Sequence, residues 1–575
     1  MAPAAGVRAA DFVNPGVPLQ FRVVIEAPLL MKAKLERGLD LVRWQREERM
    51  TPALLQTLVA EARVETERAA AAEGYFSAVV RTSIEAEEDL SVVRITLEPG
   101  PRATVAAVEL RFRGAVALGG ERNDKRMAAV RREWLLPVGE PFRQEDWETA
   151  KRGAVGELSR ELYANASIVA SEARVDPERH TATLRVELES GPPFRFGTAV
   201  VSGTRRYPAS IVENLYPIRP GDDYDATRLA VFQRRLIESG YFATAQITVD
   251  RDPAKVDAAP VQVAVTEGRA QRIDTGINFS TDTRLGAQLS YSHQDLADSA
   301  MRLRTLLRID SKTETAEASV DTPPRPGGVW NTVTARYEAT DIENQRTDGG
   351  MLGVSYNWGV ESTPSQISLS AHRERQEVVG STTEHNRAVF LGFRQTYRRT
   401  DDPLVPRRGL LGSVQLGASI PGTGTQDFAR ATAKANFLWP LGRSVDLAAR
   451  AEGGIVFADT SSGIPTTFLF RTGGDQTVRG YAFQSIGVQE GDAIVGGRYL
   501  VVGSVEATWW LLGDWGAAAF VDAGDAFDDR SLFDLAIGYG VGARWRSPIG
   551  PFRADVAYGE RTQQWRLHFS VGFSF

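Results

Sequence analysis

Apolar and polar residues alternate strictly over the last eleven residues of the chain, from Trp565 to Phe575. Successive side chains of an extended strand point to opposite faces, so this alternation predicts a strand with one wholly apolar face. The residues on that face are Trp565, Leu567, Phe569, Val571, Phe573 and Phe575. A length of about 9–11 residues suits a tilted strand that crosses a bilayer. The pattern favours a membrane strand over its alternative, the terminal strand of a soluble sandwich.

The same alternation runs through the second half of the chain, where helical periodicity is absent and Gly, Asn, Asp and Ser separate short runs. One run places Leu303 and Leu307 on one face and Arg304 and Arg308 on the other. Arginine on one face and leucine on the other fit a barrel with a polar lumen and an apolar exterior. We count roughly sixteen such runs. They predict a 16-stranded antiparallel transmembrane β-barrel over residues 270–575.

The first half of the chain consists of three copies of a mixed α+β unit. Each copy has an opening strand, two stretches with helical periodicity and two further strands, which is the order β-α-α-β-β. The copies end in similar residues, Glu-Pro-Gly, Glu-Ser-Gly and Glu-Gly. Repeats of this length predict a string of small domains. We place an N-terminal segment at residues 1–17 and the three domains at residues 18–101, 102–191 and 192–269.

A Gly-Tyr-Phe tripeptide follows the second helix of two of these copies. It stands at residues 74–76 in the first copy and at residues 240–242 in the third. The second copy has Glu161-Leu162-Tyr163 at the corresponding place. We take Gly-Tyr-Phe as the start of a strand, so the departure weakens the placement of that strand in the second copy.

Composition narrows the class of protein. The chain is 24% charged with a mean hydropathy of −0.24, and no apolar run reaches the length of about 18 residues that a transmembrane helix needs. The chain has a net charge of −6, whereas nucleic-acid-binding proteins usually carry an excess of basic residues. Cysteine is absent and the five histidines lack the spacing of metal ligands. We therefore expect no nucleic-acid partner, no metal, no cofactor and, without a nucleophile motif, no enzymatic activity.

One gap between expected barrel strands is much longer than the others. Residues 454–498 are rich in Gly and polar groups and follow the eleventh expected strand. Loops of more than about 15 residues are usually functional or disordered. If the repeats precede a barrel whose first strand runs outward, loops after odd strands are external. The long loop therefore begins on the outside.

The long loop contains Val478-Arg479-Gly480-Tyr481, and a later strand contains Phe520, Asp522 and Gly524 as Phe-x-Asp-x-Gly. These two motifs resemble those of the outer-membrane assembly factors, the BamA and TamA family, to which two-partner secretion transporters are related. The resemblance implies that the loop folds into the lumen and that its arginine meets the motif aspartate. An arginine in a polar lumen needs acceptors, which Asp522 would supply. The alternative is that Arg479 merely lines a porin-like lumen.

The resemblance covers nearly the whole chain and carries further implications. The β-α-α-β-β units resemble polypeptide-transport-associated (POTRA) domains, and three of them before the barrel resemble the TamA branch most. The resemblance implies an outer-membrane insertase with POTRA domains in the periplasm. It also implies a large periplasmic partner like TamB, and clients such as autotransporters or other barrel proteins. No apolar signal segment is visible near Met1, so such a location would require a signal peptide removed before this chain begins. The family's C-terminal assembly signal maps onto Phe569, Val571, Gly572, Phe573 and Phe575.

The insertase hypothesis gives a role to the junction of the first and last strands. We expect these strands to meet antiparallel and to part for a client strand, whose backbone is then hydrogen-bonded as it enters lipid. The candidate inward positions are Asp274, Gly276 and Asn278 on the first strand and His568, Ser570 and Gly572 on the last. Two rival functions are a two-partner secretion transporter, which exports a protein through the lumen, and a passive porin.

Overall fold

The computed structural model describes residues 20–46, 50–87, 90–360, 362–402, 406–442, 444–547 and 550–571. The N-terminal segment 1–17 lies outside the described residues, as do Gly572, Phe573 and Phe575 of the expected assembly signal. No helix in the described ranges is long and apolar enough to cross a membrane. The chain divides into two compact units. One contains the first two repeats and part of the third, and the other contains the remainder of the third repeat and all of the barrel.

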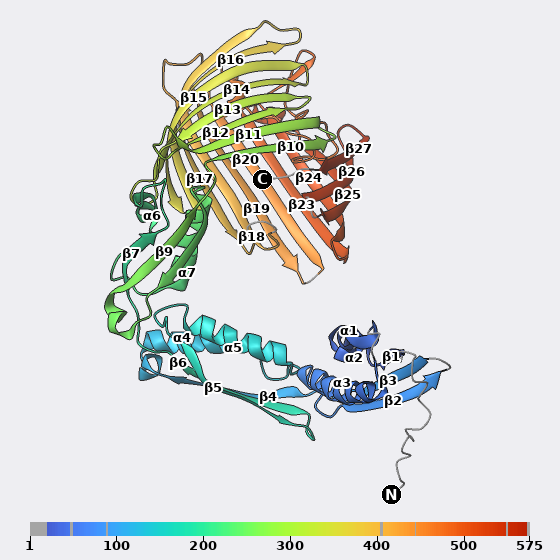
Figure 1. Cartoon of the computed structure of the whole chain (residues 1–575). Helices are drawn as coiled ribbons and strands as arrows, with labels where there is room; N and C mark the ends of the chain where they lie inside the picture. The colour runs from blue at the N-terminus through green and yellow to red at the C-terminus, as the bar shows by residue number, and fades with distance from the viewer. Residues whose placement is uncertain are drawn as a thin grey trace. The chain divides into compact units, whose positions relative to one another are not determined.

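The first repeat has the expected β-α-α-β-β order, with its first helical stretch broken in two (Figure 1). Its second long helix begins after Thr51, whose side chain accepts a hydrogen bond from the N–H of Leu54, and Pro52 occupies the first turn. The strands order β1-β3-β2, with β1 parallel to β3. The elements are β1 (Phe21–Glu26), α1 (Leu29–Gly38), α2 (Asp40–Arg43), the 3₁₀ turn η1 (Trp44–Arg46), α3 (Pro52–Ala72), β2 (Val79–Glu87) and β3 (Leu90–Glu98).

The second and third repeats follow the same plan, with sheet orders β4-β6-β5 and β7-β9-β8. The second repeat comprises β4 (Thr104–Arg113), η2 (Ala115–Leu118), α4 (Glu121–Arg132), α5 (Gln144–Leu158), β5 (Ser167–Asp176) and β6 (Thr181–Glu189). The third comprises β7 (Phe196–Ser202), α6 (Ser210–Leu215), α7 (Ala226–Glu238), β8 (Phe242–Val249), η3 (Pro253–Ala258) and β9 (Ala259–Glu267). In every repeat the last strand occupies the centre of the sheet.

Gly-Tyr-Phe forms a turn in the first and third repeats, and the second repeat has the same turn. In the second repeat the turn begins at Leu162, one residue after the Glu161 that we matched to the glycine. Gly74 and Gly240 have φ of 92° and 78°, and Leu162 has φ of 67°. Leu162-Tyr163 therefore corresponds to Gly-Tyr, and the fourth element of each copy begins after this turn. The expectation that Gly74 itself opens a strand is wrong, because a left-handed backbone cannot continue an extended ladder and β2 starts only at Val79.

The second half of the chain closes into a barrel of sixteen antiparallel strands, which confirms the expected fold class (Figure 1). The strands are β10 (Gln271–Ser280), β11 (Arg284–Leu296), β12 (Met301–Ile309), β13 (Thr313–Asp321), β14 (Trp330–Ile342), β15 (Gln345–Val360), β16 (Thr363–Val378), β17 (Glu384–Thr400), β18 (Gly409–Ser419), β19 (Ala429–Leu441), β20 (Val445–Phe457), β23 (Tyr499–Leu512), β24 (Trp515–Phe527), β25 (Ala536–Ser547), β26 (Gly550–Gly559) and β27 (Gln564–Val571).

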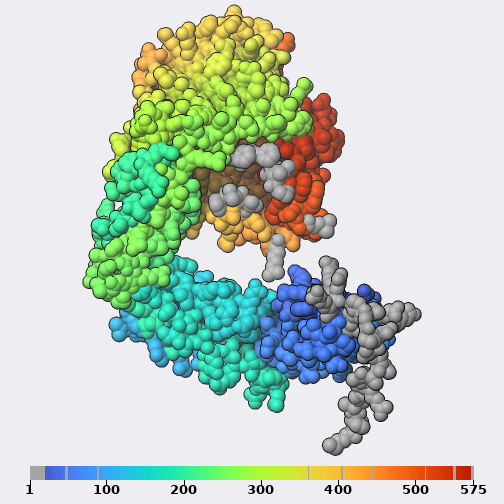
Figure 2. Space-filling view, viewed as in Figure 1, coloured from blue at the N-terminus to red at the C-terminus, as the bar shows by residue number. Residues whose placement is uncertain are grey.

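The alternation along the last strand is realised as expected. Trp565 and Leu567 on β27 are 66% and 61% exposed on the outside, whereas His568 is buried with 3% exposure. Large apolar side chains on the exterior suit a barrel in lipid, because they meet hydrocarbon rather than water. In Figure 2 the last strands (red) and the first strands (green) form neighbouring parts of the barrel surface.

The first and last strands close the barrel at a contact that we call the seam. β10 pairs with β27 at two positions, Phe279 with Val571 and Ser280 with Ser570. The N–H of Thr281 adds a bond of 3.1 Å to the carbonyl of Phe569. The opposite edge of β10 pairs with β11 along its whole length, from Gln271 to Ser280.

Candidate functional site

The long loop after the eleventh strand folds against the inside of the barrel wall. β20 continues to Phe457, so the loop spans residues 458–498 rather than the expected 454–498. It contains η4 (Thr466–Phe468) and the small hairpin β21 (Val488–Glu490) and β22 (Ala493–Val495). Its apolar side chains, among them Phe468 and Val478, share one buried cluster with the wall residues Val502 and Ala526. Burial of apolar area is what holds a loop of this length in a polar lumen.

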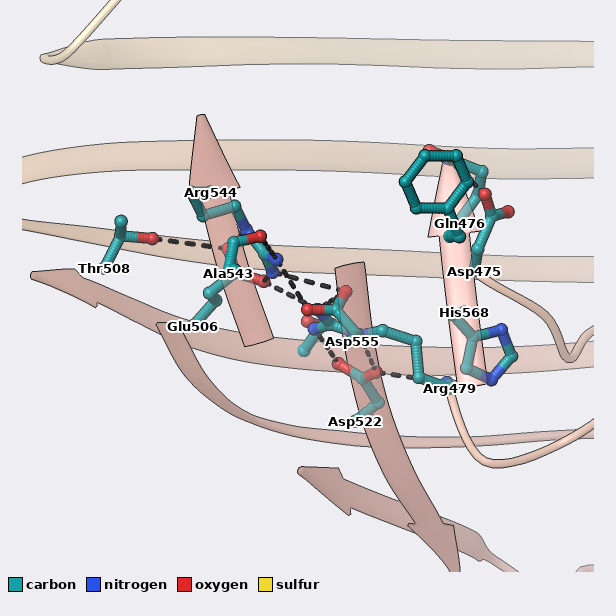
Figure 3. Close-up of polar contacts among 12 residues, drawn as sticks. Asp475, Gln476, Arg479, Glu506, Thr508, Asp522, Ala543, Arg544, Asp555 and His568 are labelled. Atoms are coloured by element: carbon teal, nitrogen blue, oxygen red, sulfur yellow. Dashed lines mark hydrogen bonds and ion pairs between the residues drawn. The ribbon is translucent and has the colours of Figure 1, made fainter. Parts of the chain in front are cut away.

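The structure brings Arg479 of the loop to Asp522 of β24 (Figure 3). Nε and Nη2 of Arg479 donate to the two carboxylate oxygens of Asp522 over 2.7 and 2.9 Å. The backbone N–H of Arg479 donates to the same carboxylate over 3.1 Å. The Arg479 guanidinium lies 3.3 Å from the centroid of the Phe520 ring. Both charged residues are buried, at 2% and 0% exposure, so this fork has the geometry of a strong charge-assisted pair.

Three further charged residues complete the cluster around Arg479. Nη1 of Arg479 donates to Glu506 of β23 over 2.7 Å and to Asp555 of β26 over 3.2 Å. Arg544 of β25 bonds the same two carboxylates, with Nη2 2.8 Å from Glu506 and Nη1 2.5 Å from Asp555. The loop arginine is therefore tied to strands that are not adjacent to one another.

Arg450 of β20 completes the charge balance of this group. Its Nη1 donates to the carbonyl of Gln476 in the loop over 2.8 Å, and its Nη2 lies 3.9 Å from Asp522. Three arginines thus face three carboxylates. Buried ions persist only when they are paired and hydrogen-bonded, and this cluster meets that condition. We name Arg450, Arg479, Glu506, Asp522, Arg544 and Asp555 the lumen cluster.

Backbone packing explains why glycines surround Arg479. Gly480 has φ of 93°, and a Cβ there would lie 2.7 Å from the backbone nitrogen of Gly559. A Cβ on Gly538 of β25 would lie 1.8 Å from the carbonyl oxygen of Arg479. Neither position has room for a larger residue, so the loop tip lies directly on the backbone of the wall.

The remaining motif residues fix the loop on either side of Arg479. Val478 is fully buried, and a Cβ on Gly524 would meet its Cγ2 at 2.8 Å. The hydroxyl of Tyr481 donates to the carbonyl of Ile537 over 3.0 Å and accepts from the N–H of Arg561 over 3.0 Å. Both sequence motifs therefore meet at one place, with Phe520 and Gly524 forming the surface on which the loop rests.

The proposed seam positions are only partly brought together. Ser570 pairs across the seam, but its partner is Ser280. Residues 572–575 lie outside the described part of the chain, so the pairing of Asp274, Gly276 and Asn278 with the last strand stays a prediction. His568 lies beyond the strand pairing and accepts a hydrogen bond from the N–H of Gly480 over 2.9 Å. On the other side its Nδ1 lies 3.7 Å from Oδ1 of Asp282, in the turn that follows β10.

Sequence reasoning missed Glu506, Arg544 and Asp555, and it did not connect His568 with the loop. Each lies at an inward position of its strand, among other polar inward residues such as Thr508, Arg546 and Arg553. A charge at an inward position needs a partner inside the barrel, but this signal alone does not single out these three charged residues. The described residues contain no group of His, Asp or Glu that could hold a metal ion.

Comparisons with known proteins agree with this geometry. The family model of the Omp85 superfamily domain matches residues 266–575, which is more than half of the chain. The chain belongs to the Omp85 superfamily. A POTRA model, described as a surface antigen variable number repeat, matches residues 194–268. Membership of Omp85 confirms the resemblance, and it places the barrel in the bacterial outer membrane with the POTRA domains in the periplasm.

Two relatives within Omp85 are outer membrane protein assembly factors BamA. The one from Nitratidesulfovibrio vulgaris is 22% identical over 515 residues, which cover 84% of this chain and 63% of that protein. The one from Neisseria meningitidis serogroup B is 22% identical over 584 residues, covering 87% of this chain and 71% of that protein. The chain thus spans about two thirds of the length of these relatives.

A solved structure of BamA from Haemophilus ducreyi, lacking POTRA domains 1–3, has a similar fold. It aligns with a TM-score of 0.56 and 14% identity, over 81% of this chain and 99% of that chain. At this identity the likeness concerns the fold alone. The lumen cluster and the seam are therefore described from the residues of this chain.

Proposed function

We propose that this protein is an insertase of the TamA type, which assembles autotransporters or other β-barrel proteins by opening its seam. The observation that carries the proposal is that the barrel of this Omp85 chain closes by pairing its first strand, β10, with its last strand, β27. The protein does this without enzymatic chemistry and without a cofactor.

The lipid bilayer explains why such an opening would be productive. A polypeptide in hydrocarbon must satisfy its own backbone hydrogen bonds. Once the seam opens, the edge of β10 that faced β27 is left without a neighbouring strand. A client strand could pair there first and leave the barrel sideways with its N–H and C=O groups satisfied.

A disulfide across the seam tests the proposal. The chain lacks cysteine, so Ser280→Cys with Ser570→Cys is an unambiguous pair at directly opposed positions. Opposed residues lie within the Cα separation of about 7 Å that a disulfide requires. The matched control joins the neighbouring strands β14 and β15 through Thr340→Cys and Thr347→Cys, whose hydroxyls are 2.7 Å apart.

The oxidised seam variant should remain a folded barrel and lose client insertion, and reduction should restore it. The oxidised control should insert clients at the normal rate. Normal insertion by a fully oxidised seam variant would exclude lateral opening. Secretion of an exoprotein by that variant would favour the two-partner secretion transporter. A steady, large ion conductance of the unmodified protein would favour the passive porin.

The POTRA domains supply edges for a periplasmic partner. β1 and β2 flank β3 in the first repeat, so each has one edge without a neighbour in that sheet. Exposed edges bind extended segments by adding a strand. We propose that a large periplasmic protein like TamB binds here, while unfolded clients use the same mode more transiently. A substitution of Val80 by proline on β2 should weaken partner binding in a pull-down, whereas one of Thr57 on the exposed face of α3 by alanine should not.

A further inference from the structure

The tip of the long loop contacts both sides of the seam. The N–H of Asp475 donates to Oδ2 of Asp282 over 2.7 Å. Asp282 lies in the turn that follows β10, the first strand. Five residues later, the N–H of Gly480 donates to Nε2 of His568 on β27, the last strand, over 2.9 Å. One short loop segment is therefore bonded to each of the two strands that would have to separate.

The two seam residues also meet each other in a buried position. The side chains of His568 and Asp282 are 3% and 7% exposed, and His568 Nδ1 lies 3.7 Å from Asp282 Oδ1. Because Nε2 accepts from Gly480, the neutral ring carries its proton on Nδ1, which points toward Asp282. No hydrogen-bond partner of Nδ1 is found among the described residues. The gap to Asp282 is too long for a hydrogen bond, so this part of the contact is under-satisfied.

The carboxyl groups of Asp475 and Asp282 form a second unusual contact at this place. The carboxyl group of Asp475 faces that of Asp282, and His568 is the titratable group that faces both. Two carboxylates at a shared buried site repel each other unless one of them holds a proton. The contact therefore combines two directed hydrogen bonds with two neighbouring carboxyl groups. Such a contact can hold the loop tip and still release it.

We propose that this contact is a latch, in which the loop tip holds the seam closed through Asp282 and His568. The biological purpose of the latch rests on the proposed function. Its action, however, is a property of the protein in the absence of clients. The seam opens only when the loop tip leaves one of the two strands, so loop release and seam opening occur together. His568 and Asp282 act as positioning residues, since they act through the loop and not on a client.

Three variants separate the parts of the latch. His568→Leu removes the acceptor for Gly480 and should loosen the loop tip and the seam together. His568→Gln keeps an acceptor oxygen within reach and should restore much of the closure. Asp475→Asn replaces one of the two neighbouring carboxyl groups by an amide that can donate to Asp282, so it should tighten both. The control is Thr466→Val, which removes the bond of 2.6 Å between the loop and Glu374 on β16, far along the barrel wall from the seam.

Hydrogen–deuterium exchange of the full-length protein in lipid nanodiscs, with no client present, measures the outcome. His568→Leu should speed exchange of peptides containing residues 474–481 and 279–281 by about tenfold, as expected for a lost buried hydrogen bond. Asp475→Asn should slow both, and Thr466→Val should leave residues 279–281 unchanged. Heat-modifiable mobility verifies that each variant is a folded barrel.

The latch is overturned if the loop tip exchanges faster in His568→Leu while the seam does not, or if Asp475→Asn speeds exchange. These outcomes leave the proposed function intact, because the disulfide across Ser280 and Ser570 tests client insertion separately. If the disulfide fails to block insertion while the exchange results hold, the latch exists but does not serve lateral insertion.

Discussion

Arg479 and Asp522 are joined by three hydrogen bonds, two from the guanidinium and one from the backbone N–H of the arginine. One residue lies at the tip of a loop and the other on β24 of the barrel wall. Since all three bonds are buried, the pair fixes both the side chain and the backbone of the loop tip. Its loss should be visible as a change in the position of the whole loop.

We expect Arg479→Ala and Asp522→Ala each to loosen the loop and reduce client assembly, with the double variant little worse than either single one. Removing one partner of a buried pair costs about 3–5 kcal/mol, because the other charge is left without compensation. Residues in contact give non-additive effects. Protease sensitivity of the loop and client assembly are the measurements. Losses that add fully would show that the two side chains act independently.

Alanine at the glycines beneath Arg479 should loosen the loop without removing any charge. Gly538→Ala places a Cβ against the Arg479 carbonyl, and Gly480→Ala adds both a close contact and a left-handed backbone. Overpacking of this kind costs about 1–3 kcal/mol. The matched control is Gly503→Ala on β23, where a Cβ would meet nothing within 4 Å. Equal protease sensitivity in all three variants would contradict this account.

Deleting Phe575 should lower the yield of folded barrel. The apolar face of the last strand must be recognised before the barrel exists, and Phe575 is its final residue. Heat-modifiable mobility of the membrane fraction reports the yield. An unchanged folded yield would remove the assembly-signal hypothesis for this chain.

The joint between the first two repeats should weaken in acid. Burial raises the pKa of Glu73, but hydrogen bonds from Arg143 and Lys34 outweigh this effect and hold the pKa below its ordinary value of 4.5. The lowered pKa means that Glu73 stabilises the joint above that value and that this contribution is lost as pH falls further. Arg143 belongs to the second repeat and lies 2.9 Å from Glu73.

Limited proteolysis between the two repeats, measured as a function of pH, checks this prediction. Cleavage should rise as the pH falls below about 4.5 in the unmodified protein. Glu73→Gln should cleave faster at neutral pH and show no such rise. An acid-induced rise that survives in Glu73→Gln would assign it to other groups.

Much of the fold follows from periodicity in the sequence. The change from helical to alternating patterns marks the start of the barrel, and strict alternation from Trp565 onward predicts which side chains face lipid. The contact between Arg479 and Asp522 was predictable because both residues stand in motifs that resemble a known family, in which the loop arginine meets the strand aspartate. The first two features depend on the order of residues within one short segment, and the third depends on two recognisable motifs.

Other features depend on closure of the barrel, which no local pattern encodes. Glu506 and Asp555 lie on strands far apart in the sequence, and only the curved wall brings them to one arginine. The register of the seam is set by closure of the whole barrel, and it places Ser280 opposite Ser570. The turn at Leu162 was missed because leucine rarely adopts positive φ, and the surrounding repeat must hold it there.

The balance of charge in the lumen cluster has an electrical consequence. With the loop in place, three arginines match three carboxylates, and a passing ion meets no excess of either sign. Withdrawal of the loop removes Arg479 and leaves the cluster with three carboxylates, Glu506, Asp522 and Asp555, and two arginines, Arg450 and Arg544. The opened passage would then attract cations at this point, so the same movement that widens the path also gives it a preference for positive charge.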